Sequence, residues 1–236
     1  MVVPGPKPIY SLLSIADLVT ILNLLLGFAA LIALVNGDTL AGSLLILAAV
    51  LGDGADGLLA RGAEQSPFGE ALDSLADVVA FGVAPALLLT LVLAPWPPAG
   101  PALGGGFLAC GTLRLARFHL RGPSRESFQG LPITAAGLAA ALFLLASPVG
   151  LPPWGLAPWG ALLSCLMVSN LRYPKLRGRA ILLPVGSLAA ALLASQLAFP
   201  PARPWTALAL LGMVSVYLAA PLLRRKPLEA GPREAP

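Results

Sequence analysis

Eight runs of apolar residues divide this sequence, and each is long enough to cross a lipid bilayer as a helix. A helix crosses the hydrocarbon core with about 17–25 residues, and in lipid its backbone groups must bond within the helix itself. Only 11% of the residues are charged, against about 25% in an average soluble domain. The sequence therefore predicts an all-α membrane protein, a bundle of about eight transmembrane helices at residues 18–36, 39–60, 72–94, 102–120, 132–148, 154–171, 180–199 and 205–223.

The polar segments at the two ends are short, and no linker separates a second domain. Residues 1–16 are expected to form a cytosolic or interfacial lead, residues 17–223 the transmembrane bundle, and residues 224–236 a cytosolic tail. Lys7 precedes the first apolar run, as it would in a signal peptide. That run is longer than the apolar region of a signal peptide, about 7–15 residues, so we expect a retained helix.

Basic residues indicate the orientation of these helices, because Lys and Arg concentrate in cytoplasmic loops. With the N-terminus in the cytosol, 14 of the 15 basic residues fall in cytosolic segments, and Arg203 lies outside. The net charge of +4 then reflects membrane orientation and contact with anionic headgroups. We expect an integral protein of the cell membrane and no binding of nucleic acid.

Aspartates on either side of a predicted cytosolic bend give the strongest functional signal. Their spacing is D-x2-D-G-x2-A-R-x7-G-x3-D-x3-D, with carboxylates at Asp53, Asp56, Asp73 and Asp77. Side chains three or four residues apart share a helix face, so two antiparallel helices would present one pair of carboxylates to the other. An ionisable group near hydrocarbon costs about 2.5–3.5 kcal/mol, and like charges repel. Cations between the carboxylates would offset both costs.

The ligand atoms of this cluster indicate which cations it could hold. Oxygen ligands without nearby His or Cys suit Mg²⁺, Mn²⁺ or Ca²⁺ and argue against zinc. Two ions could be held as in two-metal phosphoryl-transfer sites. Gly57 and Ala60 remove side-chain bulk from the same face, and Arg61 offers a planar fork for phosphate oxygens.

Two other interpretations of the aspartates stay open. They could cap helix ends or simply face water. They could also form the ion site of a divalent-cation or solute transporter. Transporters generally place coupling carboxylates near the bilayer midplane, whereas these border one cytosolic loop.

All eight positions of this spacing match the signature of the CDP-alcohol phosphotransferase family, and the chain resembles these membrane enzymes of phospholipid synthesis over residues 53–77. The resemblance implies the helical fold of that family, two divalent cations, Mg²⁺ or Mn²⁺, on the four aspartates, and Asp77 as the base that activates the acceptor hydroxyl. It also implies attack of an alcohol on the lipid-linked phosphate of a CDP-lipid, with release of CMP. The residues that would shape the CDP-lipid site are Gly57, Ala60, Arg61 and Gly69.

Weaker features concern the acceptor alcohol. The D-x2-T-x2-N opening of the first helix, which carries Thr20 and Asn23, resembles the phosphatidylserine synthases of bacterial and archaeal type, as do FQGLPITAAG at 128–137 and SNLRYPK at 169–175. The resemblance adds Thr20 and Asn23 to the CDP-lipid site. Each feature also has a structural explanation: Asp17, Thr20 and Asn23 could cap the helix or join helices, and residues 130–132 could form only a turn.

Serine as the acceptor would need a cation for its carboxylate, and Arg114, Arg117 and Arg172 could supply it. Glycerol 3-phosphate or inositol phosphate would want the same cations, and Arg114 and Arg117 could instead be membrane anchors. His119 is expected to lie at the interface without a chemical role. The sequence thus predicts metal-dependent transfer of a phosphatidyl or archaetidyl group from a CDP-lipid to L-serine, on the cytosolic side, by a membrane enzyme for which the family resemblance implies a homodimer.

Overall fold

A computed structural model describes residues 13–59, 69–121, 127–174, 190–191, 194–195 and 198–223. Within these residues the chain is almost entirely helical. The first three helical segments run from α1 (Ile15–Val35) through α2 (Thr39–Leu59) to α3 (Gly69–Asp77). A π-helical segment, η2 (Val78–Val83), joins α3 directly to α4 (Ala84–Val92). The later helices are α5 (Ala99–Arg121), α6 (Ile133–Ala146), α7 (Leu156–Val168) and α9 (Arg203–Leu223).

Short elements connect the later helices. The 3-10 turns are η3 (Ser147–Val149), η4 (Pro153–Gly155) and η5 (Pro200–Ala202). The strands β1 (Ser127–Gln129) and β2 (Arg172–Pro174) pair antiparallel, with Phe128 opposite Tyr173. This small sheet joins the segment before α6 to the segment after α7, so it ties together two connections on the same side of the bundle. The sequence patterns did not predict it.

The first helix begins earlier than its apolar run, because it has its own start signal. Ser14 and Asp17 form a capping box: the Ser14 hydroxyl accepts a hydrogen bond from the Asp17 amide at 3.2 Å, and the Asp17 carboxylate accepts one from the Ser14 amide at 2.6 Å. The structural explanation for Asp17, a helix cap, is therefore confirmed. One face of α1 is buried from Thr20 to Leu34, while the opposite face exposes apolar side chains such as Leu22 and Phe28.

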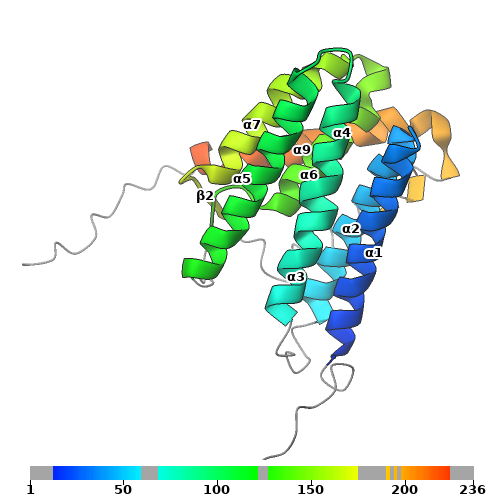
Figure 1. Cartoon of the computed structure of the whole chain (residues 1–236). Helices are drawn as coiled ribbons and strands as arrows, with labels where there is room; N and C mark the ends of the chain where they lie inside the picture. The colour runs from blue at the N-terminus through cyan, green and yellow to red at the C-terminus, as the bar shows by residue number, and fades with distance from the viewer. Residues whose placement is uncertain are drawn as a thin grey trace, which may run out of the picture.

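Helices α3, η2 and α4 form one continuous rod between the α1–α2 hairpin and the α5–α7 pair (Figure 1). Gly27 lets α1 approach this rod closely, since a Cβ at Gly27 would lie 2.6 Å from the Cα of Ala80. On the other side, α5 packs against α4 and α7, and α6 packs against α9. Phe81, Leu88, Leu89 and Leu142 are among the fully buried side chains of the core.

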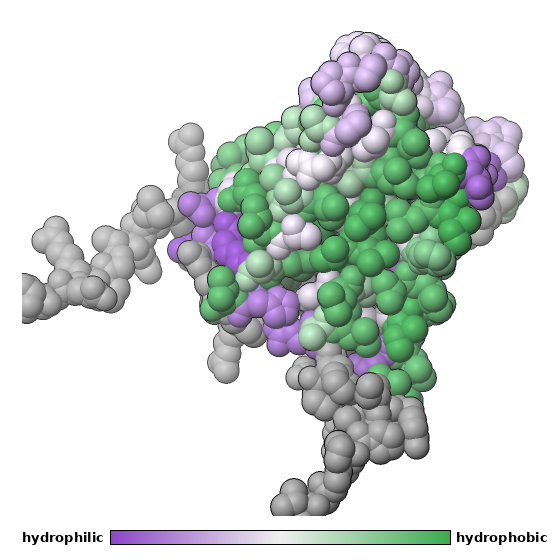
Figure 2. Space-filling model, in the orientation of Figure 1, coloured by the Kyte–Doolittle hydropathy of each residue, from purple (hydrophilic) through white to green (hydrophobic). Residues whose placement is uncertain are grey.

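The outer surface of the bundle is apolar. Figure 2 shows a broad hydrophobic area along the helices, with hydrophilic residues gathered toward the end where α5 finishes and β2 lies. Among the described residues, three helical rods are long and apolar enough to cross a membrane: Ile15–Val35, Gly69–Val92 and Pro200–Leu222. Shorter apolar helices occupy Thr39–Gly54, Ile133–Val149 and Pro153–Val168. A helical membrane bundle is confirmed, whereas the count of eight spans stays a prediction, since most of the span predicted at 180–199 lies outside the described residues.

Candidate functional site

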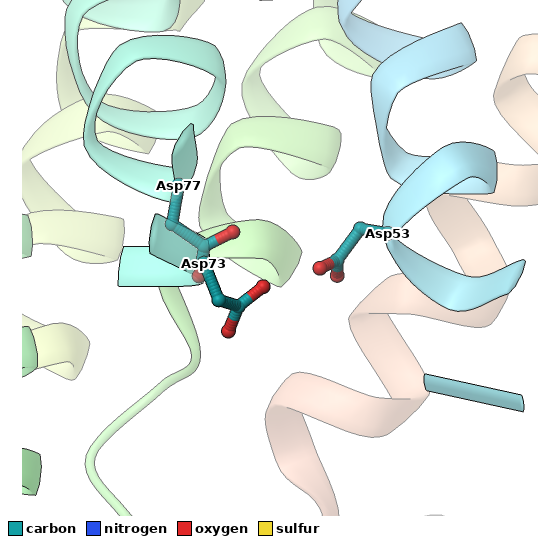
Figure 3. A group of neighbouring side chains, drawn as sticks. All are labelled: Asp53, Asp73 and Asp77. Atoms are coloured by element: carbon teal, nitrogen blue, oxygen red, sulfur yellow. The ribbon is translucent and has the colours of Figure 1, made fainter. Parts of the chain in front are cut away.

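Three of the predicted aspartates converge at the end of the bundle where α2 stops and α3 starts. Asp53 points from α2 toward Asp73 and Asp77, which lie one turn apart on α3 (Figure 3). One carboxylate oxygen from each of the three lies within 4.8 Å of the others. The i,i+4 spacing puts Asp73 and Asp77 on one face of α3, and the antiparallel course of α2 brings Asp53 opposite them. The facing arrangement expected from the spacing is confirmed for these three residues.

Whether a cation fits this cluster depends on which partners the carboxylate oxygens already have. Asp77 is 7% exposed, and within the described part of the chain its Oδ1 atom is buried without a hydrogen-bond partner. A buried carboxylate oxygen without a partner is costly, and here two further carboxylates face it. A hard divalent cation satisfies such an all-oxygen set. The residues present therefore fit a divalent metal.

Of the other signature residues, only Gly69 lies where the structure describes both the backbone and the surroundings. Asp56 and Gly57 lie in the last turns of α2, where side chains are not described, and Ala60 and Arg61 lie outside the described residues. Gly69 is the first residue of α3, one turn before Asp73. Asp77 ends α3 and is followed at once by the π-helical segment η2, a form that is rare in helices and frequent at functional sites.

Helix α1 contributes polar side chains to the same end of the bundle. Asn23 is 2% exposed, and its Oδ1 atom is buried without a hydrogen-bond partner among the described residues. That oxygen would lie 3.9 Å from a Cβ placed on Gly52, the residue before Asp53. Thr20 is also buried, and its hydroxyl donates to the carbonyl of Ala16 at 3.2 Å. The Oδ1 atom of Asn23 thus lies near the carboxylate-bearing end of α2 without a hydrogen-bond partner among the described residues.

Arg114 brings a positive charge to the carboxylates from α5. Its side chain is 7% exposed, and its charge attracts that of Asp77. The guanidinium carbon lies 5.8 Å from the ring centre of Phe118 and 5.4 Å from that of Phe128. Within the described residues, no carbonyl or side chain accepts a hydrogen bond from Arg114. A buried guanidinium in this state has donors available for an anion.

The two other candidate arginines differ from Arg114 and from each other. Arg117 donates from its guanidinium to the carbonyls of Gln129 at 2.9 Å, Met167 at 3.1 Å and Val168 at 3.2 Å. Arg172 is exposed on β2, opposite Gln129 in the strand register. The sequence alone made Arg114 and Arg117 equal candidates for binding the acceptor. The contacts distinguish them: Arg114 lies near Asp77, and Arg117 is bound to backbone carbonyls.

The sequence did not predict the aromatic rings around Arg114, nor the contact between His119 and the residue beside Asp73. Phe118 and Phe128 lie over the guanidinium, and no periodicity indicated that residues from α5 and β1 would meet there. His119, for which no chemical role was expected, lies 3.4 Å from the hydroxyl of Ser74, the residue after Asp73. The contact places the end of α5 beside α3.

Comparison with known proteins matches the sequence to one family. The family model described as CDP-alcohol phosphatidyltransferase matches residues 13–169, which is more than half of the chain. The archaetidylserine synthase of Methanothermobacter thermautotrophicus is 33% identical over 175 residues, covering 73% of this chain and 74% of the relative.

Two further relatives carry the same printed name, CDP-diacylglycerol–serine O-phosphatidyltransferase. The protein from Methanocaldococcus jannaschii is 37% identical over 172 residues, covering 71% of this chain and 77% of the relative. The protein from Bacillus subtilis is 32% identical over 165 residues, covering 69% of this chain and 91% of the relative. The matched region contains the three converging aspartates and Arg114, and the chain belongs to the CDP-alcohol phosphatidyltransferase family.

Proposed function

We propose that this chain is a membrane phosphatidyltransferase that moves a phosphatidyl or archaetidyl group from a CDP-lipid to the hydroxyl of L-serine. The observation that carries the proposal is the placement of the buried Arg114 guanidinium, without a hydrogen-bond acceptor among the described residues, near the facing carboxylates. The carboxylates suit a metal-bound pyrophosphate, and the guanidinium suits a carboxylate-bearing acceptor. The names of the relatives support serine as that acceptor.

In this proposal the carboxylates of Asp53, Asp56, Asp73 and Asp77 hold two divalent cations, Mg²⁺ or Mn²⁺. The chemistry those ions supply when bound is neutralisation of the pyrophosphate and of the charge that develops on leaving CMP. Gly57, Ala60, Arg61 and Gly69 shape the space around the nucleotide and its phosphates, and Thr20 and Asn23 line it from α1.

The chemical step is a substitution at the lipid-linked phosphorus. The serine Oγ forms a new bond to that phosphorus, the bond from phosphorus to the CMP oxygen breaks, and CMP leaves with the bonding electrons. A serine hydroxyl has a pKa far above neutrality, so its proton must be removed as it attacks. In the proposal Asp77 takes that proton on a carboxylate oxygen.

Arg114 is the residue we assign to the acceptor. Its planar guanidinium can meet the serine carboxylate with two parallel hydrogen bonds, which would orient the hydroxyl toward the phosphorus. Arg117 already donates to three backbone carbonyls, and Arg172 is exposed on β2, so we give neither a direct contact with serine.

The proposal places the site on the cytosolic side of the membrane, where CDP-lipid headgroups and serine are both available. The distribution of basic residues supports this orientation. The lipid tails would leave the site sideways between helices into the bilayer. A homodimer in the membrane completes the proposed assembly, which cross-linking in native membranes can test.

The experiment that tests the function is a CMP-release assay with purified protein in detergent, a CDP-lipid and one alcohol at a time. L-Serine should support release, while ethanolamine, glycerol 3-phosphate and inositol phosphate should support much less. EDTA should abolish release, and added Mg²⁺ or Mn²⁺ should restore it. Preference for a phosphorylated alcohol would overturn the serine assignment. No CMP release with any alcohol would favour a transporter, because detergent-solubilised protein has no ion gradient to use.

A further inference from the structure

The side chain of Arg117 connects three elements that are distant in the sequence. From α5 its guanidinium donates to the Gln129 carbonyl in β1 and to the Met167 and Val168 carbonyls at the end of α7. The last carbonyls of a helix lack intrahelical partners, so a guanidinium that binds two of them fixes where the helix ends. Arg117 thereby ties the end of β1 and the end of α7 to one point on α5.

Gly130 makes this connection possible. Its backbone has a φ of +77°, in the left-handed region that glycine adopts without a steric penalty. A Cβ at Gly130 would collide with the Met167 carbonyl oxygen and with the Arg117 guanidinium. Two backbone hydrogen bonds hold the same turn. The Gly130 amide donates to the Leu171 carbonyl at 2.8 Å, and the Leu131 amide donates to the Leu166 carbonyl at 3.0 Å.

The connection sets the position of Phe128, which is one residue before Gln129. Phe128 faces Tyr173 in the strand register, and its ring lies over the Arg114 guanidinium at 5.4 Å. Tyr173 is fully buried, and its hydroxyl donates to the Leu218 carbonyl of α9 at 3.4 Å. The sheet is therefore anchored to α9 on one side and to Arg117 on the other, with Phe128 between the anchors.

Phe128 in turn restricts Arg114. An aromatic ring over a guanidinium holds the plane of that group by cation–π attraction and stacking. Rings from two elements, Phe118 on α5 and Phe128 on β1, contact Arg114. The donor edges of the guanidinium are then held in a fixed plane before an acceptor arrives, which reduces the entropy lost on binding.

We infer that Arg117 is a positioning residue for the acceptor: by binding the backbone at Gln129, Met167 and Val168, it holds Phe128 over Arg114 and so sets the guanidinium that receives the carboxylate of the acceptor. The inference rests on the proposed function, in which Arg114 meets serine. Arg117 itself touches no substrate. Its guanidinium donates to three backbone carbonyls, and in this inference its contribution to serine binding passes through Phe128 and Arg114.

The first test is Arg117→Ala in the full-length protein, assayed by CMP release. The KM for serine should rise roughly three- to thirtyfold, about 0.7–2 kcal/mol, the size of a cation–π contact. The kcat and the KM for CDP-lipid should stay close to wild type, because the carboxylate cluster is untouched. Arg117→Lys should recover only part of the loss, since one ammonium cannot reproduce the planar fork. Leu120→Ala, a change at an exposed position on the same helix, is the matched control.

The second test separates positioning from a general loss of structure. If Arg117 acts through Arg114, Arg117→Ala should raise the serine KM little further in an Arg114→Ala background, because interacting residues are not additive. Gly130→Ala disturbs the same connection from the opposite side and should raise the serine KM in the wild-type background as well. Thermal unfolding of each variant in detergent records whether folded protein is being assayed.

The outcomes divide clearly. An unchanged serine KM in Arg117→Ala, or full additivity with Arg114→Ala, overturns the positioning role while leaving the proposed function intact. Loss of folded protein in both Arg117→Ala and Gly130→Ala would make the connection purely structural and would also overturn the inference. If the wild-type enzyme does not use serine, the proposed function fails first, and the inference fails with it.

Discussion

The α2–α3 end of the bundle and the β1–β2 sheet differ in whether their polar groups have hydrogen-bond partners. At the α2–α3 end, carboxylates face one another, and the Oδ1 atoms of Asn23 and Asp77 are buried without partners among the described residues. At the sheet, Arg117 donates to three backbone carbonyls, and the side-chain Nε2 of Gln129 donates to the side-chain Oδ1 of Asn170 at 3.0 Å. A folded protein rarely leaves buried polar atoms unpaired, so the first region is a candidate ligand site, whereas the paired groups of the second region hold structure.

Arg114 belongs with the first region although it lies on the same helix as Arg117. Both carry the same guanidinium, three residues apart on α5. One is buried under aromatic rings near Asp77, and the other binds backbone. What separates the candidate binding arginine from the structural one is therefore whether its donors already have hydrogen-bond acceptors, and not its residue type or its place on the helix.

The largest effect is expected at Asp77, the proposed base. Asp77→Asn keeps the shape of the side chain but cannot accept the serine proton. Turnover should fall by about 10²–10⁴-fold, the contribution typical of a general base, while CDP-lipid affinity stays close to wild type. Single-turnover CMP release and equilibrium CDP-lipid binding measure the two quantities. Parallel loss of binding would instead make metal ligation the main role of Asp77.

Asp53 and Asp73 test whether the facing carboxylates act as one site. Asp53→Asn or Asp73→Asn removes a charge from a shared ligand set, so turnover should fall by about 10²–10³-fold, as for loss of one electrostatic contact to the reacting group. Higher Mg²⁺ should recover part of the loss. Asp38→Asn is the matched control: Asp38 accepts a hydrogen bond from the Ala41 amide at 2.8 Å at the start of α2, and Asn caps a helix equally well. Near-native turnover in either test variant would remove that residue from the site.

Arg114→Ala sharpens the contrast between the two arginines. A charge-assisted contact of about 1.5–3 kcal/mol corresponds to a rise in serine KM of roughly ten- to 150-fold. Ethanolamine lacks the carboxylate, so the variant should use it no less well than wild type does. Initial rates with both acceptors at saturating CDP-lipid provide the measurement. An equal loss for both acceptors would mean that Arg114 supports the carboxylates of the enzyme and does not meet the acceptor.

The smallest effect concerns the packing that holds the ligand-binding region in place. Gly27→Ala would put a Cβ 2.6 Å from the Cα of Ala80, so α1 must move away from η2 at a cost of about 1–3 kcal/mol. The midpoint of thermal unfolding in detergent should fall by several degrees. Gly105→Ala, where a Cβ meets nothing within 4 Å, should keep or slightly raise the midpoint, because Ala favours a helix interior over Gly. Equal stability of the two variants would show that α1 and η2 are not tightly coupled.

The convergence of the carboxylates could be predicted from the sequence because it depends on local geometry. A spacing of four residues places Asp73 and Asp77 on one face, and a polar stretch between two apolar runs predicts that the second helix runs back beside the first. The distinct roles of Arg114 and Arg117 could not be predicted, because they depend on Phe128 and Met167, residues that reach α5 through other connections. The start of α1 at Ile15 came from a local cap that hydropathy does not register.

The π-helical segment after Asp77 has a consequence for how this rod can change over evolutionary time. An α-helix advances about 100° per residue, so removing one residue from Val78–Val83 to restore a regular helix would rotate Asp73 and Asp77 by roughly that angle relative to α4. The carboxylates would then turn away from Asp53 while α4 kept its contacts with α5. The π-helical segment therefore rotates one part of the rod relative to the other, so that Asp73 and Asp77 face Asp53 while α4 faces α5.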